Sequence, residues 1–143
     1  MARAEAVETI LSPIKKVFEV VTDYEKYPEF IPEMKKVEVL EDEDSVKVVR
    51  FHLNLLKPIQ YTIRCEVVKS PFEMTWKLID SDFFKENDGG WKLKKIGDGE
   101  TQATYYISCD FKMFMPAMII NKIVSAQLPK MLSCFKKRIE GEV

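Results

Sequence analysis

Apolar residues of the C-terminal region recur at spacings of three and four between residues 116 and 139. This spacing is typical of one face of an α-helix. Pro116 suits the first helical position, where its missing N–H is no loss. We predict one helix of roughly 24 residues, about 36 Å long, with a bend at Pro129. The apolar stripe consists of Ile120, Val124, Leu128, Met131, Leu132, Phe135 and Ile139.

The beginning of this helix is apolar on all sides rather than on one face. Lys112 is the only charged residue between Phe111 and Ile120. Two explanations stand for such a surface: burial against the rest of the domain, or flexible Met and Phe side chains that line a ligand cavity. If the residues from Met113 to Ile120 are exposed instead, they favour a homodimer.

The N-terminal region predicts one strand and two short helices. Residues 2–10 alternate between apolar and polar, as in a strand. Ser12 and Pro13 fit the N-cap and first position of a short helix. Asp23 can begin a second helical turn, which Pro28 and Pro32 confine.

From residue 34 onward the apolar period changes to two, which is typical of β-strands. Strands are expected near residues 34–40, 45–55, 59–67, 74–78, 91–94 and 104–111. Turns are expected at 41–44, 57–58, 70–71 and 97–99, with a longer loop at 80–90. Consecutive strands joined by short turns form an antiparallel sheet, whose apolar face must be covered. We predict an α+β fold in which about six to seven twisted strands curve around the C-terminal helix and leave a cavity.

The composition limits the possible functions. The 143 residues favour a single domain over residues 1–143, and 22 Lys+Arg against 23 Asp+Glu leave a net charge of −1. No DNA binding by counterion release is expected at this charge. No apolar run is long enough to span a membrane, and the first residues do not resemble a signal peptide. Cys65, Cys109 and Cys134 lack metal-binding spacing and indicate buried thiols in a reducing compartment, so we expect a cytoplasmic protein.

Strand parity and helix phase assign a set of residues to the wall of the expected cavity. Tyr61 and Tyr105 are either core residues with satisfied hydroxyls or hydrogen-bonding partners of a ligand. Phe83 and Phe84 are adjacent aromatics in a polar loop, so they form either a lid over the cavity or an anchor for the loop. The expected lining residues are Phe51, Leu53, Tyr61, Ile63, Trp76, Trp91, Tyr105, Ile107, Met118 and Leu128.

Few residues qualify for catalysis or metal binding. His52 is the only histidine, which excludes a multi-histidine metal site within one chain. Because successive strand residues point to opposite faces, His52 is predicted to face solvent if the neighbouring Phe51 faces the core. In the reversed register, His52 would enter the cavity as a general base. Arg64 and Asp110 would face inward only if their strands slipped by one residue. We expect no metal and no cofactor.

Three segments resemble one known family. They are residues 20–32, with the sequence VVTDYEKYPEFIP, the triplet from Gly89 to Trp91, and residues 99–105, with the sequence GETQATY. The chain resembles the polyketide cyclase/dehydrase and coenzyme Q-binding proteins of the START-like (SRPBCC) superfamily over essentially its whole length. The resemblance implies the helix-grip fold, in which an antiparallel sheet wraps a long C-terminal helix around an apolar cavity. The order of elements predicted above agrees with that fold.

The combined expectation is a non-catalytic protein that binds a hydrophobic small molecule in this cavity. A lipid, an isoprenoid quinone or a polyketide-like aromatic would fit. Two alternatives remain open: a polyketide cyclase or aromatase, and a regulator that contacts the ribosome through its surface, as some members of the resembled family do. An inward-facing His52, Arg64 or Asp110 would favour the enzyme.

Overall fold

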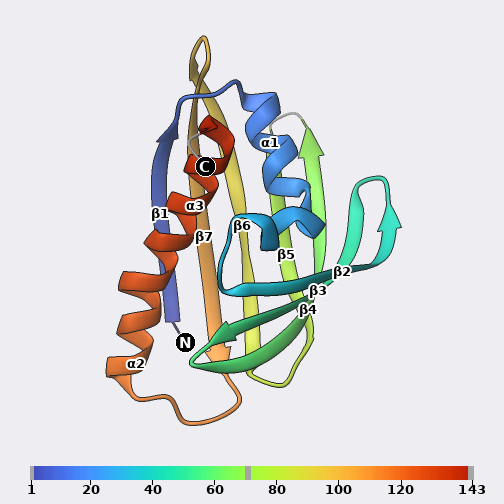
Figure 1. Cartoon of the computed structure of the whole chain (residues 1–143). Coiled ribbons are helices and arrows are strands. Elements are labelled where there is room, and N and C mark those ends of the chain that lie inside the picture. Colours follow the sequence, from blue (N-terminus) through green and yellow to red (C-terminus); the bar gives the residue numbers. More distant parts are fainter. Residues whose placement is uncertain (1, 70–71, 142–143) are drawn as a thin grey trace.

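The structure, a computed structural model, describes residues 2–69 and 72–141. The turn expected at Ser70 and Pro71 lies outside these residues. Seven strands and a set of helical segments follow the expected order (Figure 1). The strands are β1 Ala2–Ile10, β2 Met34–Glu43, β3 Val46–Leu55, β4 Lys57–Lys69, β5 Phe72–Ser81, β6 Phe84–Gly97 and β7 Glu100–Phe111. The helical segments are α1 Ile14–Thr22, η1 Tyr24–Glu29, α2 Ala117–Lys122, η2 Ile123–Gln127 and α3 Leu128–Glu140.

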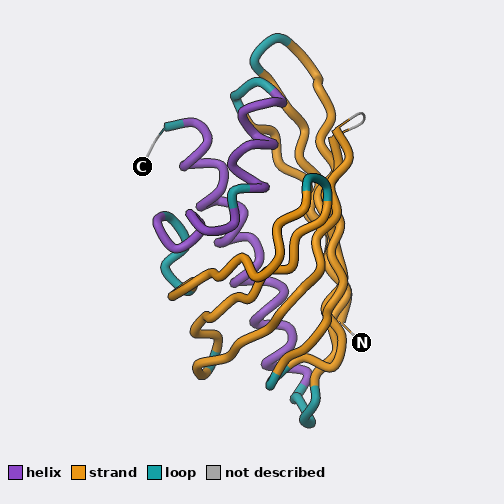
Figure 2. The backbone as a smooth tube through the Cα atoms, turned by 90° about the vertical axis from the view of Figure 1, so that its right-hand side faces the viewer, coloured by secondary structure: helices purple, strands orange, loops and turns teal. Residues whose placement is uncertain are grey.

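All seven strands form one antiparallel sheet in the order β1-β7-β6-β5-β4-β3-β2. β1 closes onto β7, so the first and last strands of the chain are neighbours. α1 and the C-terminal helix lie on the same side of this sheet, and β2 to β4 curve around beneath them (Figures 1 and 2). The predicted curved sheet around a long C-terminal helix is confirmed, and the fold is the helix-grip fold.

The C-terminal helix is 24 residues long, as predicted, but its irregularity differs from the expected bend at Pro129. Residues Ile123–Gln127 form a π-helical turn between α2 and α3. Pro129 has no N–H to donate to the preceding turn, and a wider turn is one way to accommodate that loss. Of these segments, only α3 buries side chains fully, namely Leu132, Phe135 and Ile139.

Phe135 attaches α3 to the core. Its ring centroid lies 5.1 Å from those of Tyr27, Phe30 and Trp91, in edge-on arrangements. Aromatic pairs favour this geometry because the positive ring edge meets the negative ring face. The 24-residue helix is therefore anchored firmly at its C-terminal half and only lightly at its N-terminal half.

The prediction that Ser12 is the N-cap of α1 is wrong. Pro13 occupies the N-cap position, and no side chain caps the helix. Ser12 is buried instead, and its carbonyl oxygen accepts a hydrogen bond of 2.8 Å from Thr101 Oγ1. Ser12 therefore joins the start of α1 to the sheet through its backbone.

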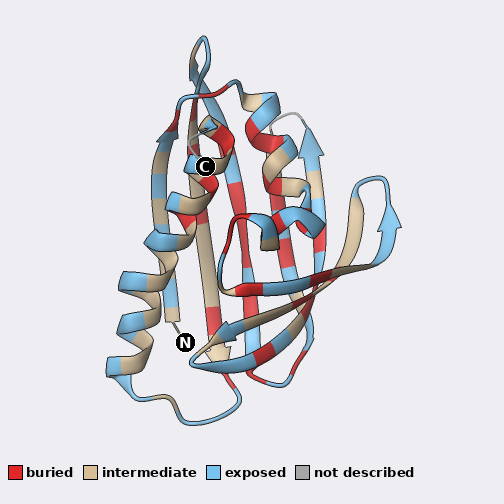
Figure 3. Ribbon diagram, in the orientation of Figure 1, coloured by how far each residue is buried: buried red, intermediate tan, exposed pale blue. Residues whose placement is uncertain are grey.

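The prediction of a long loop at residues 80–90 is also wrong. β5 continues to Ser81 and β6 begins at Phe84, so only two residues lie between them. Ser81 Oγ accepts hydrogen bonds of 3.0 Å from the backbone N–H groups of Phe83 and Phe84 and closes the turn. Of the polar residues that follow on β6, Lys85, Glu86 and Asp88 are exposed and gave the segment the composition of a loop, whereas Asn87 is buried. Figure 3 shows this mixture of exposed and buried residues along the strand.

β5 and β6 pair only over Glu73–Trp76 and Gly89–Lys92, and then separate. At the end of the paired segment, a Cβ on Gly89 would lie 2.3 Å from the Tyr106 carbonyl oxygen and 2.6 Å from the Trp76 ring. Beyond it, Asn87 Oδ1 accepts a 3.0 Å hydrogen bond from the indole of Trp76. A glycine and a bridging amide thus hold Trp76 against the inner face of the sheet.

Candidate ligand cavity

A cavity of about 130 Å³ lies between the sheet and the C-terminal helix. Its walls come from β1, β2, β3, β4, β6 and β7 and from the segment between η1 and β2, and η2 and the start of α3 cover it. The lining residues are Ala2, Arg3, Ala4, Ile31, Glu33, Met34, Leu53, Leu55, Tyr61, Phe84, Asn87, Tyr105, Ile107, Cys109, Ile123, Val124, Gln127, Leu128 and Met131. We call this space the outer chamber.

A second space of about 40 Å³ lies deeper in the core and is called the inner chamber. Tyr61, Tyr105, Met34 and Met131 border both chambers. Four side chains therefore separate one apolar space from the other. The inner chamber is lined by Tyr24, Tyr27, Met34, Phe51, Tyr61, Ile63, Met74, Trp76, Trp91, Tyr105, Met131 and Phe135.

The residues expected at the cavity divide between the two chambers. Leu53, Ile107 and Leu128 line the outer one. Tyr61 and Tyr105 line both, and the remaining inward-facing strand residues line the inner one, namely Phe51, Ile63, Trp76 and Trp91.

Met118 requires a correction. Its side chain is 80% exposed and lines neither chamber. The outer chamber is instead faced by Ile123 and Val124 of η2. The start of the helix is apolar on all sides, so the sequence does not indicate which side of it faces the cavity.

Phe83 and Phe84 are packed rather than free to open. Phe83 is 1% exposed and contacts Phe84 and Phe111, with ring centroids 5.0 and 5.4 Å apart. Phe84 also meets Tyr61 edge-on at 5.4 Å and lines the outer chamber. This packing favours a role as an anchor of the β5–β6 turn over a role as a lid of the cavity. A lid must open, and opening would cost these side chains the free energy of their buried contacts.

Phenolic hydroxyls are the main polar groups of the inner chamber. The Tyr27 hydroxyl donates to the Val21 carbonyl oxygen. The Tyr24 hydroxyl is buried and meets the geometry of a hydrogen bond with no other described residue, although the Cys65 thiol, a weak acceptor, lies next to it. Burial raises the pKa of Tyr24, Tyr27, Tyr61 and Tyr105 above the ordinary value of 10.0. All four phenols are therefore neutral at physiological pH and can donate a hydrogen bond.

The buried thiols are not activated. Burial raises the pKa of Cys65 to about 12 and that of Cys109 to about 11. A thiol attacks as its thiolate, and desolvation disfavours that charged form. Cys109 borders the outer chamber as a small apolar group.

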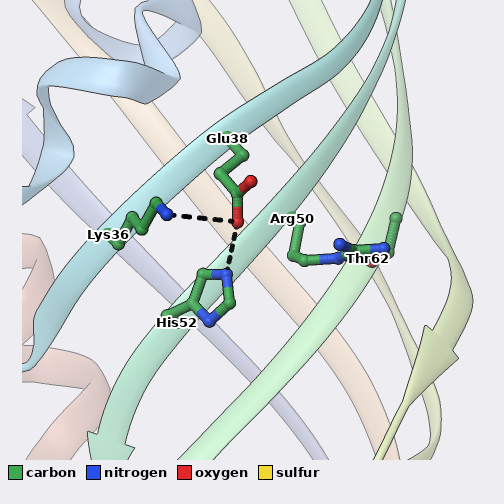
Figure 4. Close-up of polar contacts among 5 residues, drawn as sticks. All are labelled: Lys36, Glu38, Arg50, His52 and Thr62. Atoms are coloured by element: carbon green, nitrogen blue, oxygen red, sulfur yellow. Dashed lines mark hydrogen bonds and ion pairs between the residues drawn. The ribbon is translucent and has the colours of Figure 1, made fainter.

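The three conditional catalytic candidates lie on the outer face of the sheet. His52 Nε2 is 2.6 Å from Glu38 Oε1, as Figure 4 shows, and this hydrogen bond holds the pKa of Glu38 below its ordinary value. Arg64 pairs with Glu66 at 2.5 Å on the same face. Asp110 accepts a hydrogen bond from the backbone of Phe111. The strands have the register in which none of the three side chains enters a chamber.

An open groove of about 870 Å³ runs over the outer face of β1, β7, β6, β5 and β4. It is larger than either chamber, but its walls contain charged, solvated side chains, such as Arg64 and Glu66. An open groove of this kind does not remove apolar area from water, so the chambers remain the candidate site for a hydrophobic ligand.

Several lining residues were not anticipated. Tyr24 and Tyr27 come from η1, which had been assigned only a connecting role, and Met34 lies just after it. Tyr24 and Tyr27 are three residues apart in a short helical segment, which places both on one face. This spacing could have indicated that both tyrosines face the core. Met74 could have been found from parity, since it alternates with Trp76 on β5.

Within the described residues, no group of three or more His, Cys, Asp and Glu side chains is placed to hold a metal ion. None of the helices in that part of the chain is long and apolar enough to cross a membrane.

Comparison with known proteins identifies the family. A family model described as polyketide cyclase / dehydrase and lipid transport matches residues 12–136. The chain belongs to this family. The matched residues extend from just before α1 into α3 and include every residue that lines the inner chamber and all those of the outer chamber except Ala2, Arg3 and Ala4.

Relatives of several kinds resemble this family member. The ribosome association toxin RatA of Pseudomonas aeruginosa is 25% identical over 130 residues, which are 88% of this chain and 87% of that protein. The Zhui aromatase/cyclase of Streptomyces sp. R1128 superposes with a TM-score of 0.83 at 18% identity, covering 99% of this chain and 92% of that one. A START superfamily protein of Mycobacterium smegmatis gives a TM-score of 0.83 at 16% identity over 99% of both chains. At these identities the two structures show a shared fold.

Proposed function

We propose that this protein binds a hydrophobic small molecule in the two chambers and does not transform it. A lipid, an isoprenoid quinone or a polyketide-like aromatic has the required chemistry. The observation on which the proposal rests is the lining: apolar and aromatic side chains surround a few polar groups, which are neutral in the inner chamber and include the charged Arg3 and Glu33 in the outer one. Such a site gains free energy as apolar area leaves water, at about 25 cal/mol per Å², while the polar groups orient the ligand.

The present chamber volume implies that binding requires widening. Pockets for drug-sized ligands are about 300–1,000 Å³, whereas the outer chamber is about 130 Å³. η2 covers that chamber together with the start of α3, and neither η2 nor the preceding α2 contains a fully buried residue. Displacement of α2 and η2 therefore costs less than that of α3. We infer that the ligand enters by moving this segment outward while Phe135 keeps α3 in place.

Tyr24 is the strongest candidate for the group that orients the ligand. Its hydroxyl is buried at the inner chamber, where the Cys65 thiol is a weak acceptor at best, and a poorly satisfied buried hydroxyl costs up to about 1–3 kcal/mol in the empty protein. A carbonyl or hydroxyl oxygen of the ligand would accept its hydrogen bond and recover that free energy. Tyr61 and Tyr105 stand between the chambers and would contact the apolar part of the same ligand.

A cyclase of the aromatase type is less well supported. Proton transfer at a reacting chain needs a general acid or base within the cavity. His52, Arg64 and Asp110 lie on the other face of the sheet, and phenols with raised pKa values are poor bases near neutral pH. Glu33 borders the outer chamber, but its carboxylate is paired with Lys130 at 3.0 Å. The aromatase/cyclase comparison concerns the fold alone.

The direct test is native mass spectrometry of freshly purified protein, followed by titration with palmitate, a short-chain ubiquinone and 2-naphthol. We expect retained mass or a 1:1 complex with at least one probe. Leu128→Trp adds an indole to the outer chamber and should weaken that complex at least about tenfold, or about 1.4 kcal/mol.

Ala126→Trp is the matched control. Ala126 is exposed on η2, two residues before Leu128, so its variant adds the same side chain outside the chamber and should bind like the wild type. Equal binding by the wild type and the Leu128→Trp variant would refute the site. Absence of any complex with all three probes would refute the proposed ligand class.

The similarity to a ribosome association toxin favours a second candidate, a regulator that contacts the ribosome through its surface. The expected result for this candidate is co-sedimentation with purified ribosomes that decreases with salt. Leu128→Trp would leave it unchanged because the chamber has no part in it. A protein that stays in the supernatant at low salt would exclude this candidate.

A further inference from the structure

The sheet has two outermost strands, β1 and β2, and they differ in how well they can accept another strand (Figure 1). The register of β2 is interrupted twice, between Met34 and Lys36 and between Val39 and Glu41. Its last four residues are exposed, and three of them are acidic. Bulges and charges of one sign keep edge strands from pairing with other chains. β2 is therefore a protected edge.

β1 is a regular edge by comparison. Its nine residues, from Ala2 to Ile10, pair with β7 in unbroken register, and none of them is proline or glycine. Every second residue of β1 points its N–H and C=O groups away from β7, because these groups alternate between the two sides of a strand. Within the part of the chain that the structure describes, no strand lies on that side. The backbone of β1 therefore offers donors and acceptors to a further strand.

The outer face of β1 carries two charges of opposite sign. Arg3 and Glu5 are exposed on this face, and neither enters an ion pair with another described residue. Their direct neighbours on β7 are Ser108 and Tyr106, whose hydroxyl groups provide no countercharge. Opposite charges that face each other on adjacent strands stabilise the pairing of those strands. A strand on the free side of β1 could supply these countercharges.

A second copy of β1 supplies both countercharges in one antiparallel register. In a two-fold contact, residue i of one chain meets residue j of the other, and j meets i. If the axis passes through Ala4, Arg3 lies opposite Glu5 of the partner subunit, and Glu5 lies opposite Arg3 of the partner subunit. If the axis passes through Glu5 instead, two like charges face each other, which is destabilising. The charge pattern of β1 therefore selects the register around Ala4.

We propose that this protein forms a homodimer in which two β1 strands pair antiparallel around Ala4 and join the two sheets into one. The paired segment is residues 2–6. Glu8 lies outside it, and its Oε1 is 3.5 Å from Lys136 Nζ of α3 within the same chain. So short a contact falls below the interface of about 800 Å² on each partner that is typical of stable complexes, so the dimer is weak and forms as the concentration rises. This proposal does not depend on the proposed ligand.

Sedimentation velocity of the full chain at concentrations up to about 1 mM tests this equilibrium. The mass of the wild type should rise from monomer toward dimer with concentration. Arg3→Glu and Glu5→Arg each place like charges opposite each other at two symmetric positions, and each should raise the dissociation constant at least about tenfold. One variant then has two acids on this face and the other two bases, so an equimolar mixture of the two should dimerise again.

Glu41→Arg is the matched control. It reverses an exposed charge on β2, the other edge strand, and should dimerise like the wild type. A wild type that stays monomeric over the whole range, equal losses in the Glu5 and Glu41 variants, or a mixture that stays monomeric would overturn the pairing of β1.

Phe114→Ser tests the other contact that the sequence suggests, the segment from Met113 to Ile120, since Phe114 is 89% exposed. We expect this variant to dimerise like the wild type. A dimer that Phe114→Ser abolishes and Arg3→Glu leaves intact would overturn the pairing of β1 in favour of a contact through the start of the C-terminal helix.

Discussion

Gly89→Ala should destabilise the protein strongly although it adds a single methyl group to a strand. The added Cβ would lie 2.3 Å from the backbone carbonyl oxygen of Tyr106, 2.6 Å from the Trp76 ring and 3.1 Å from the Ile107 Cα. Two of these neighbours are backbone atoms of β7, which cannot turn aside. Relief therefore requires β6 to move away from β7, or Trp76 to leave the wall of the inner chamber.

The magnitude follows from the cost of overpacking. Extra methyl groups in a packed region cost about 1–3 kcal/mol, and two contacts below 3 Å place this variant at the upper end, at least about 2 kcal/mol. For a chain of this length that corresponds to a fall of roughly 6 °C in the unfolding midpoint. The assay is thermal and urea unfolding followed by circular dichroism.

Gly97→Ala is the control for this prediction. The nearest atoms to a Cβ at that position belong to Glu100 and lie 3.8–4.0 Å away, which is ordinary contact. We expect a change within about 0.5 kcal/mol. A Gly89→Ala variant as stable as the Gly97→Ala variant would refute the close approach of β6, β7 and Trp76.

The remaining predictions concern the inner chamber, the β5–β6 turn and the outer face. Tyr24→Phe should raise the free energy of unfolding by up to about 1 kcal/mol, because it removes a buried hydroxyl whose neighbour, the Cys65 thiol, is a weak acceptor, and should weaken ligand binding about fivefold in titrations. A loss of stability would contradict the first effect. Phe83→Ala should lower the free energy of unfolding by about 3–5 kcal/mol if the ring is an anchor, whereas unchanged urea unfolding with faster ligand exchange would indicate a lid. Glu38→Gln should remove stability above pH 4.5, where the wild-type carboxylate is ionised and bonded to His52. This difference should disappear as the pH falls through the lowered pKa of Glu38, and a constant difference across acid unfolding curves would contradict it.

The alternation of side chains along single strands was sufficient to predict much of the cavity wall. Successive strand residues face opposite sides, so Phe51, Tyr61 and Tyr105 were assigned inward and His52 outward from local sequence alone. The helix period likewise identified Leu132, Phe135 and Ile139 as one face, and α3 buries all three. These features depend on neighbours within one element, and the pattern of apolar residues contains that information.

Features that depend on contacts between distant segments needed the tertiary structure. The polar residues 85–90 resembled a loop because their strand is polar outside and pairs with β7, a partner that local sequence does not reveal. Met118 was assigned to the cavity because an all-round apolar segment has no preferred face until the sheet provides one. The volume of the chambers and the burial of the Tyr24 hydroxyl follow from how η1, β5–β6 and the C-terminal helix pack together. Packing of this kind is decided by the shapes of side chains far apart in sequence.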